Sequence, residues 1–205
     1  MLVFWQAKLV VLSVPKTGTT ALEAALAGRA ALVLRDPPGL KHMTLRRYRR
    51  FVLPMLEAGG GGPFETVAVL REPVSWLGSW WRYRARGEIA GHANSTRGRS
   101  FEDFVVAWCL PKPPPWAAVG SQVGYARAPD GARADRLFRY EDLSRFTAFL
   151  AARLGAPVAL PQVNVSPPGE AALSPEALAG LRGRRPEEFA AWEEAGDQPS
   201  PSSAS

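Results

Sequence analysis

Continuous apolar runs alternate with helix-forming segments along the first half of the chain. Leu9 to Leu12 and Thr66 to Leu70 are short runs rich in valine, as expected for strands that are buried on both faces. A helix-forming segment follows each run, over residues 21–26 and 72–83. Strands that alternate with helices predict an α/β fold, in which a central parallel sheet carries helices on both faces in three layers.

The second half of the chain continues this pattern less sharply. A strand is predicted within 135–140, a helix follows it over 141–154, and two short helices are predicted over 174–195. The length of 205 residues suits a single folding unit. We therefore predict one α/β domain over residues 1–195 and a disordered Pro/Ser tail over residues 196–205.

The turn after the first run has the composition of a phosphate-binding loop. Its residues are Ser13, Val14, Pro15, Lys16, Thr17, Gly18, Thr19 and Thr20. A strand, a tight turn with Lys, Gly and hydroxyls, and then a helix direct backbone N–H groups and the positive helix end at one point. The simpler alternative is an ordinary helix N-terminus, where Ser and Thr serve only as caps.

This loop is not a Walker A motif. That motif has a Gly four residues before a Gly-Lys-Ser/Thr ending, whereas here Lys16 precedes Gly18 and residues 1–17 contain no glycine. The second strand also ends in Arg71, and not in the Asp that would help to hold magnesium in a P-loop NTPase. Both observations disfavour an ATP-dependent kinase.

A second candidate phosphate site begins at Arg71. Pro73 suits the first turn of a helix, and Ser75 and Ser79 then share one helix face below Arg71. A planar, permanently charged guanidinium beside a hydroxyl suits a terminal phosphate. The alternative is that Arg71 pairs with a surface carboxylate and that Ser79 has no particular role.

The two segments together resemble the sulfotransferases that use 3′-phosphoadenosine-5′-phosphosulfate (PAPS). Pro15 to Thr20 resemble the loop that binds the 5′-phosphosulfate, and Arg71 with Ser79 resemble the motif that binds the 3′-phosphate. The resemblance implies a P-loop NTPase-like fold and a PAPS-dependent sulfotransferase. It covers residues 8–166 by the order of the motifs, and the residues that clamp adenine in the family cannot be located here.

Lys41, His42 and Thr44 resemble the Lys-His-x-Thr segment of a bacterial branch related to carbohydrate O-sulfotransferases. This resemblance implies that His42 takes the proton of an acceptor hydroxyl, and that the acceptor is a carbohydrate. An imidazole suits this role because its unperturbed pKa lies near neutrality. A lone His is more often a surface or capping residue, and Glu141 is the reserve candidate for the base. Thr44 is expected to cap the following helix in either case.

The resemblance also implies a role for each remaining site residue. Lys16 would neutralise the leaving 5′-phosphate, and the loop from Thr17 to Thr20 would hold it. PAPS is the cosubstrate, and no metal ion is required by this scheme. The loop 87–100 is a candidate lid over the acceptor, and Arg182, Arg184 and Arg185 are weak candidates for the 3′-phosphate. The segment 161–166 also resembles the family, without an assignable contact.

The formal net charge of +6 limits the choice of partners. Much of the excess lies in Arg46, Arg47, Arg49 and Arg50, which either line an acceptor cleft or form a solvated helix face. No nucleic-acid-binding motif is present, so an anionic cosubstrate is the more economical explanation. Trp76, Trp80 and Tyr83 recur at helical spacing, which is typical of a core.

No membrane span and no signal peptide are expected, because Lys8 interrupts the apolar N-terminus and no basic segment precedes it. Cys109 is the single cysteine, which excludes an internal disulfide. We therefore expect a cytoplasmic protein, and the usage of Ala, Arg, Gly and Pro indicates a GC-rich bacterial genome. A nucleotide-binding module without transfer activity remains the main alternative to an enzyme, and the sequence does not determine the oligomeric state.

Overall fold

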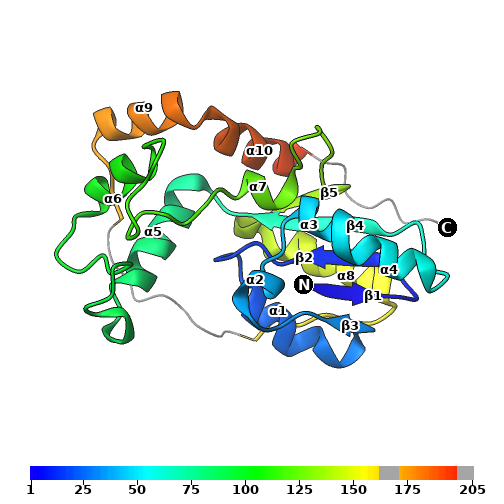
Figure 1. Cartoon of the computed structure of the whole chain (residues 1–205). Coiled ribbons are helices and arrows are strands. Elements are labelled where there is room, and N and C mark those ends of the chain that lie inside the picture. The colour runs from blue at the N-terminus through cyan, green and yellow to red at the C-terminus, as the bar shows by residue number, and fades with distance from the viewer. Residues whose placement is uncertain (162–170, 198–205) are drawn as a thin grey trace.

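A mixed five-stranded sheet forms the centre of the molecule (Figure 1). The computed structural model describes residues 1–161 and 171–197. The strand order along the sheet is β3-β1-β2-β4-β5. The strands are β1 Leu2–Phe4, β2 Leu9–Leu12, β3 Leu32–Val33, β4 Glu65–Leu70 and β5 Arg136–Arg139.

Three neighbouring strands of the sheet are parallel, and the two strands beyond them pair antiparallel. β4 runs parallel to both β2 and β5, whereas β1 runs antiparallel to β2 and to β3. The predicted wholly parallel sheet is therefore corrected to a mixed one. The physical reason is a tight turn, in which the N–H of Lys8 donates to the carbonyl oxygen of Trp5 at 3.2 Å. Residues 2–4 consequently return beside β2 as a hairpin.

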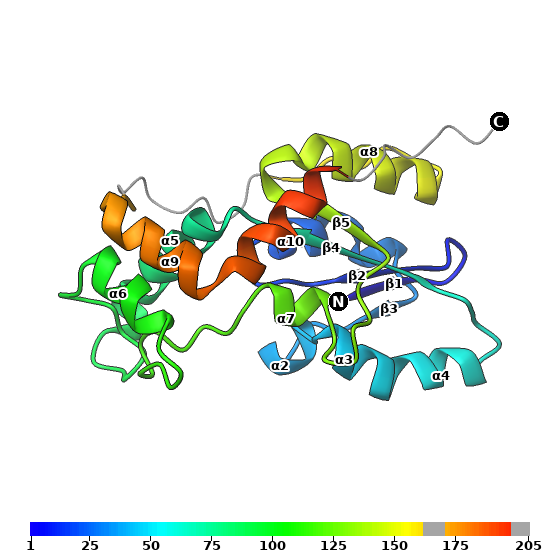
Figure 2. The same cartoon turned by 90° about the horizontal axis from the view of Figure 1, so that it is seen from above.

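Helices cover both faces of the sheet, as the alternation of strands and helices predicts (Figure 2). The larger helices are α1 Thr19–Leu26, α4 Leu53–Ala58, α5 Pro73–Arg84, α6 Phe101–Trp108, α8 Leu143–Leu154, α9 Pro175–Arg184 and α10 Pro186–Asp197. The shorter ones are α2 Pro38–Lys41, α3 Leu45–Arg47 and α7 Val123–Ala126. Single turns complete the set: η1 Ala27–Arg29, the π-helical η2 Tyr48–Val52, η3 Gly87–Ile89 and η4 Tyr140–Asp142.

Alternate residues of the strands supply two cores. Val11, Val67 and Val69 pack with α1 and α8 on one face. Val10 and Leu12 point to the opposite face, where the helical segment 45–58 and helices α7 and α10 cover them. This alternation follows from the two-residue period of a strand, and it explains why β2 and residues 67–70 of β4 are apolar on both faces.

A third apolar cluster lies beyond the sheet. Helices α5, α6 and α9 pack together there around Trp76, Phe104 and Trp108, and Figure 2 shows this group at the end of the sheet to which α5 extends. The cluster lies at this end of the sheet because α5 begins directly after the end of β4. The cluster therefore stands beside the carboxyl end of β4, where ligands of α/β sheets commonly bind.

The predicted helix cap at Thr44 is confirmed, and Ser100 caps helix α6 in the same way. The Thr44 hydroxyl accepts the N–H of Arg47 at 3.3 Å, and the Ser100 hydroxyl accepts the N–H of Asp103 at 3.0 Å. Helix α10 continues through Gly196 and Asp197, which are the first two residues of the predicted tail. The rest of that tail lies outside the described residues, as does the segment from Gln162 to Ser166.

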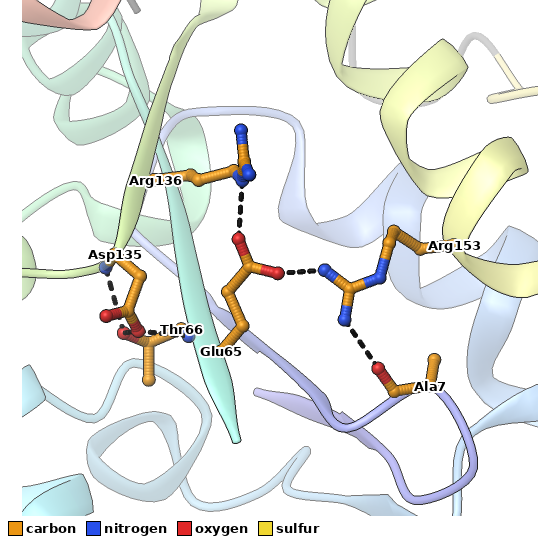
Figure 3. Close-up of polar contacts among 6 residues, drawn as sticks. All are labelled: Ala7, Glu65, Thr66, Asp135, Arg136 and Arg153. Carbon is orange, nitrogen blue, oxygen red and sulfur yellow. Dashed lines mark hydrogen bonds and ion pairs between the residues drawn. The ribbon is translucent and has the colours of Figure 1, made fainter. Parts of the chain in front are cut away.

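Polar contacts fix the register of β4 and β5 at the end of the sheet away from the loop (Figure 3). Glu65 forms ion pairs with Arg136 of β5 and with Arg153 of α8. The Asp135 carboxylate accepts both the N–H and the hydroxyl of Thr66 at 2.7 Å. These contacts attach β5 and α8 to the amino end of β4, far along the strand from Arg71.

Within residues 1–161 and 171–197, no helix combines the length and the apolar character that a bilayer crossing requires.

Candidate functional site

The predicted phosphate loop follows β2 with a strained backbone. Lys16 has φ 68° and Gly18 has φ 78°, so two left-handed residues flank Thr17. The Thr17 hydroxyl donates to the carbonyl oxygen of Val14 at 2.8 Å, which holds the turn closed from inside. A left-handed conformation costs a lysine on the order of 1 kcal/mol, and such strain concentrates at functional sites.

Helix α1 begins directly after this turn. Its N-cap is Gly18, no side chain caps it, and its first turn holds no acidic residue. Its first N–H groups therefore face outward without a carboxylate, an arrangement that favours a bound anion. Thr19 is buried and Thr20 is exposed, so Thr20 supplies the accessible hydroxyl at this end.

Lys16 extends from the loop toward α5. Its Nζ atom lies 4.2 Å from the centre of the Tyr83 ring and 5.5 Å from that of Trp80. Burial, together with the positive charges of Arg86, Arg71 and Arg82, lowers the pKa of Lys16 to about 8. An anion that reached this group would relieve that repulsion, so the electrostatics favour a negatively charged ligand.

Arg71 joins the two predicted phosphate segments. Its Nη1 atom donates to the carbonyl oxygen of Lys16 at 3.4 Å, and its guanidinium stacks on Tyr140 with Cζ 4.5 Å from the ring centre. The ring of Tyr140 also lies beside Gly18, because a Cβ atom there would be 3.5 Å from Tyr140 Cε2. The strand end, the loop and Tyr140 therefore form one continuous site.

The serine that contacts Arg71 is Ser75. Arg71 Nε donates to Ser75 Oγ at 2.9 Å. Glu72 is the N-cap residue of α5, and its carboxylate accepts the backbone N–H of Ser75 at 2.7 Å. Ser79 lies one turn further along α5 and is only 3% exposed. The structure therefore pairs Arg71 with Ser75 and places Ser79 deeper on the same helix.

The aromatic stripe of α5 serves the loop as well as the core. Trp76 is 1% exposed, as predicted, and its Nε1 donates to the carbonyl oxygen of Pro15 at 2.9 Å. Trp80 and Tyr83 lie against the Lys16 ammonium, and Tyr83 is 38% exposed. Sequence periodicity identifies the stripe but not this contact, because the loop and α5 are far apart in the chain.

His42 lies against the start of the loop. It is the C-cap residue of α2, and its Nδ1 atom is 2.7 Å from the carbonyl oxygen of Ser13. Because a carbonyl only accepts, Nδ1 carries the proton and Nε2 keeps its lone pair. Burial lowers the pKa of His42 below its usual value, against the opposing effect of the Ser13 contact. A neutral imidazole with a free Nε2 meets the requirement for a general base.

Glu141 is less suited to the role of reserve base. Its Oε1 accepts the N–H of Glu72 at 2.9 Å, and its Oε2 accepts Nε1 of Trp192 at 3.0 Å. Both carboxylate oxygens therefore hold the backbone of α5 and the α10 helix in place.

Two groups of arginines predicted as candidates have structural partners. Arg47 donates to the Gly39 carbonyl, and Arg49 pairs with Asp130. Arg185 donates to the Trp108 carbonyl, and Arg182 stacks on Phe189, 4.2 Å from the ring centre. These contacts account for part of the basic charge without a ligand.

Gln122 is a site residue that sequence reasoning missed. Its side-chain amide accepts the N–H of Arg71 and donates to the Arg71 carbonyl oxygen, both at 2.8 Å. It is 1% exposed and stands at the start of α7. The chain separation of Gln122 and Arg71 leaves no local signal for this contact.

The residues of this site hold no evident metal cluster. The described ranges contain no group of three or more His, Cys, Asp or Glu side chains that could bind a metal ion. No protein-family model matches the chain, and no curated protein or solved structure matches it significantly.

Proposed function

We propose that this protein is a PAPS-dependent sulfotransferase with a P-loop NTPase-like fold. The observation that carries the proposal is the contact between Arg71 and the Lys16 carbonyl, which unites the predicted 5′-phosphosulfate loop with the predicted 3′-phosphate motif. Neither segment alone distinguishes a nucleotide site from an ordinary helix N-terminus. Their contact at the ends of two neighbouring parallel strands favours a ligand with two anionic groups.

The loop suits the 5′-phosphosulfate of the donor. The uncapped N-terminus of α1 and the hydroxyl of Thr20 would bind the phosphate, and the Lys16 ammonium would neutralise the charge that develops on it. Arg71, held by Ser75, would bind the 3′-phosphate, with Ser79 on the same helix face. This division of roles rests on the family resemblance.

The transfer step requires one base and one leaving group. The acceptor oxygen attacks the sulfur in line, the bond from sulfur to the 5′-phosphate oxygen breaks, and 3′-phosphoadenosine-5′-phosphate leaves. His42 Nε2 would accept the proton of the acceptor hydroxyl, since its Nδ1–H is held by Ser13. Positioning and charge stabilisation would supply most of the rate enhancement, as in phosphoryl transfer.

The acceptor class in this proposal is a carbohydrate hydroxyl, and the protein would act in the cytoplasm, where its donor is made. The loop 87–100 lies against the C-terminal end of α5, since Arg97 Nε donates to the carbonyl oxygen of Ala85, the C-cap residue, at 3.1 Å. A segment in this position is suited to contact the acceptor.

A transfer assay tests the proposal. Radiolabelled PAPS would be incubated with the protein and a panel of polysaccharides, with EDTA present, and labelled product would be separated from donor. We expect labelled polysaccharide and stoichiometric 3′-phosphoadenosine-5′-phosphate. Donor binding without turnover on any acceptor would identify a binding module instead. A parallel assay replaces PAPS and EDTA with labelled ATP and magnesium, and phosphate transfer in that assay would identify a kinase and would reject the proposal.

A further inference from the structure

Glu188 is a buried carboxylate that the proposed reaction does not use. It lies in the first turn of α10 and is 2% exposed. Neither of its carboxylate oxygens has a hydrogen-bond partner of good geometry among residues 1–161 and 171–197. Burial raises the pKa of this carboxyl to about 7. An ionisable group in this state is costly, and buried polar groups without partners occur most often where they have a role.

The groups nearest to Glu188 belong to the start of α7. The Ser121 hydroxyl and the N–H groups of Gln122 and Val123 face the carboxyl and favour its ionised form. Gln122 is the residue whose side chain holds both backbone polar groups of Arg71. Glu188 therefore lies directly behind the residue that fixes the tip of β4.

Within residues 1–161 and 171–197, no ion pair is formed by this carboxyl. Glu187 on the same helix is a charged group that acts on it, and its effect is repulsive. Several arginines on or next to the elements that pack on α10 have partners elsewhere: Ser75 for Arg71, Pro115 for Arg84, Glu194 for Arg127, Glu65 for Arg136, Trp192 for Arg139, Phe189 for Arg182 and Trp108 for Arg185. Arg82 of α5 and Arg184 of α9 are further charged groups on these elements. A change in the charge of Glu188 is therefore expected to act on the segment 121–123, whose polar groups face the carboxyl.

We propose that Glu188 is a positioning residue, which transmits its protonation state through Gln122 to Arg71. The effect on donor affinity rests on the proposed function, whereas the coupling from Glu188 through Gln122 to Arg71 does not. When Glu188 is protonated, it adds no negative charge behind Arg71, and the positive charge of Arg71 attracts an anion at full strength. Ionised Glu188 pulls the N–H groups of residues 122 and 123 toward itself and adds a negative charge behind the site. By linkage, an anion bound at Arg71 must raise the proton affinity of Glu188 by the same factor.

The direction of the stability effect is also determined. The folded protein holds the Glu188 proton more tightly than the unfolded chain does. The protonated carboxyl therefore stabilises the fold fully below 4.5, the pKa in the unfolded chain, and this stabilisation is lost as the pH rises through the folded pKa of about 7. A Glu188→Gln variant keeps the size of the side chain and stays neutral. We expect it to melt at the temperature of the wild type in acid and at a higher temperature above neutrality.

The direct test is a pH titration of the free protein by NMR, following the side-chain Nε–H signal of Arg71. This signal is protected by its bond to Ser75 and is assigned by its loss in Arg71→Lys. In the wild type we expect the chemical shift of this signal to change with a midpoint near pH 7, the pKa of Glu188 being about 7. In Glu188→Gln the chemical shift should not change over this pH range. Gln122→Met should abolish the shift at Arg71 while the pH dependence of melting persists.

The same variants are then compared in their affinity for 3′-phosphoadenosine-5′-phosphate. We expect the wild-type affinity to fall by about threefold from mildly acidic to mildly alkaline pH, and the Glu188→Gln affinity to fall less. A shift at Arg71 that persists in Glu188→Gln would overturn the inference. Failure of the nucleotide to bind would instead reject the proposed function, because the titration of the free protein would still report the coupling.

Discussion

His42 donates its Nδ1–H to the carbonyl oxygen of Ser13 over 2.7 Å, at the residue where β2 turns into the phosphate loop. This bond ties the candidate base to the backbone of the donor site and selects the tautomer whose Nε2 accepts a proton. The base and the loop therefore move together, although 29 positions separate them in the chain.

Replacing His42 tests its role as the base. His42→Ala and His42→Gln should lower turnover by roughly 10²–10⁴-fold, the usual contribution of a positioned base. Because the base contacts the acceptor and not the donor, the affinity for 3′-phosphoadenosine-5′-phosphate should change by less than about twofold. Turnover and nucleotide titration would be measured in parallel. Wild-type turnover in both variants would assign His42 a structural role only.

The lowered pKa of Lys16 predicts a pH limit on donor binding. The free protein loses this proton as the pH rises through about 8, and an anion binds the ammonium form. Nucleotide affinity should therefore weaken above that pH, by up to roughly tenfold per pH unit. Lys16→Arg keeps its charge throughout the range and should flatten the profile. Calorimetric titrations at several pH values provide the measurement, and an identical slope in both proteins would argue against a contact between Lys16 and the donor.

Two tryptophans of α5 offer a matched comparison. Trp76 Nε1 donates to the loop at Pro15, whereas Trp81 Nε1 donates to the Arg99 carbonyl at 3.1 Å, away from the loop. Each change to Phe removes one indole hydrogen bond, worth about 1 kcal/mol of unfolding free energy, and Trp76→Phe adds the cost of a cavity because Trp76 is 1% exposed. Only Trp76→Phe should also weaken nucleotide binding. Equal nucleotide affinities in the two variants would show that the Pro15 contact does not shape the site.

Glu65 separates stability from binding. It pairs with Arg136 and Arg153 at the amino end of β4 and is 21% exposed. Glu65→Gln should lower the unfolding free energy by about 1–3 kcal/mol, since two guanidinium groups lose their carboxylate. The exposed Glu57→Gln serves as a control and should have little effect. Chemical denaturation and nucleotide titration together would show whether the site tolerates this loss.

Local sequence patterns predicted the parallel part of the fold because each β–α unit carries its own signal. These local signals are the valine-rich runs of β2 and β4, Pro73 at the start of α5 and the cap Thr44, and each of them acts within a few residues. The hairpin of β1 was missed because residues 1–12 are apolar apart from Gln6 and Lys8, so the turn at Lys8 interrupts the pattern only weakly.

The contacts between distant segments of the site were beyond local patterns. Gln122, Tyr140 and Glu188 reach Arg71 or its neighbours from elements that follow it by about fifty residues or more. Helical spacing likewise placed Ser75 and Ser79 on one face but could not decide which of them binds Arg71. That choice depends on the position of the guanidinium at the strand end, which is set by tertiary packing.

The most direct test of the central claim is a calorimetric titration in EDTA that compares 3′-phosphoadenosine-5′-phosphate with AMP, which differs only in the 3′-phosphate. The account predicts that the 3′-phosphate improves affinity by at least about tenfold in the wild type, the scale of a charge-assisted contact to Arg71. In Arg71→Lys the two nucleotides should bind with similar affinities. Equal binding of both nucleotides to the wild type, or tighter binding of Mg·ATP in a buffer with magnesium, would contradict the assignment of a PAPS site.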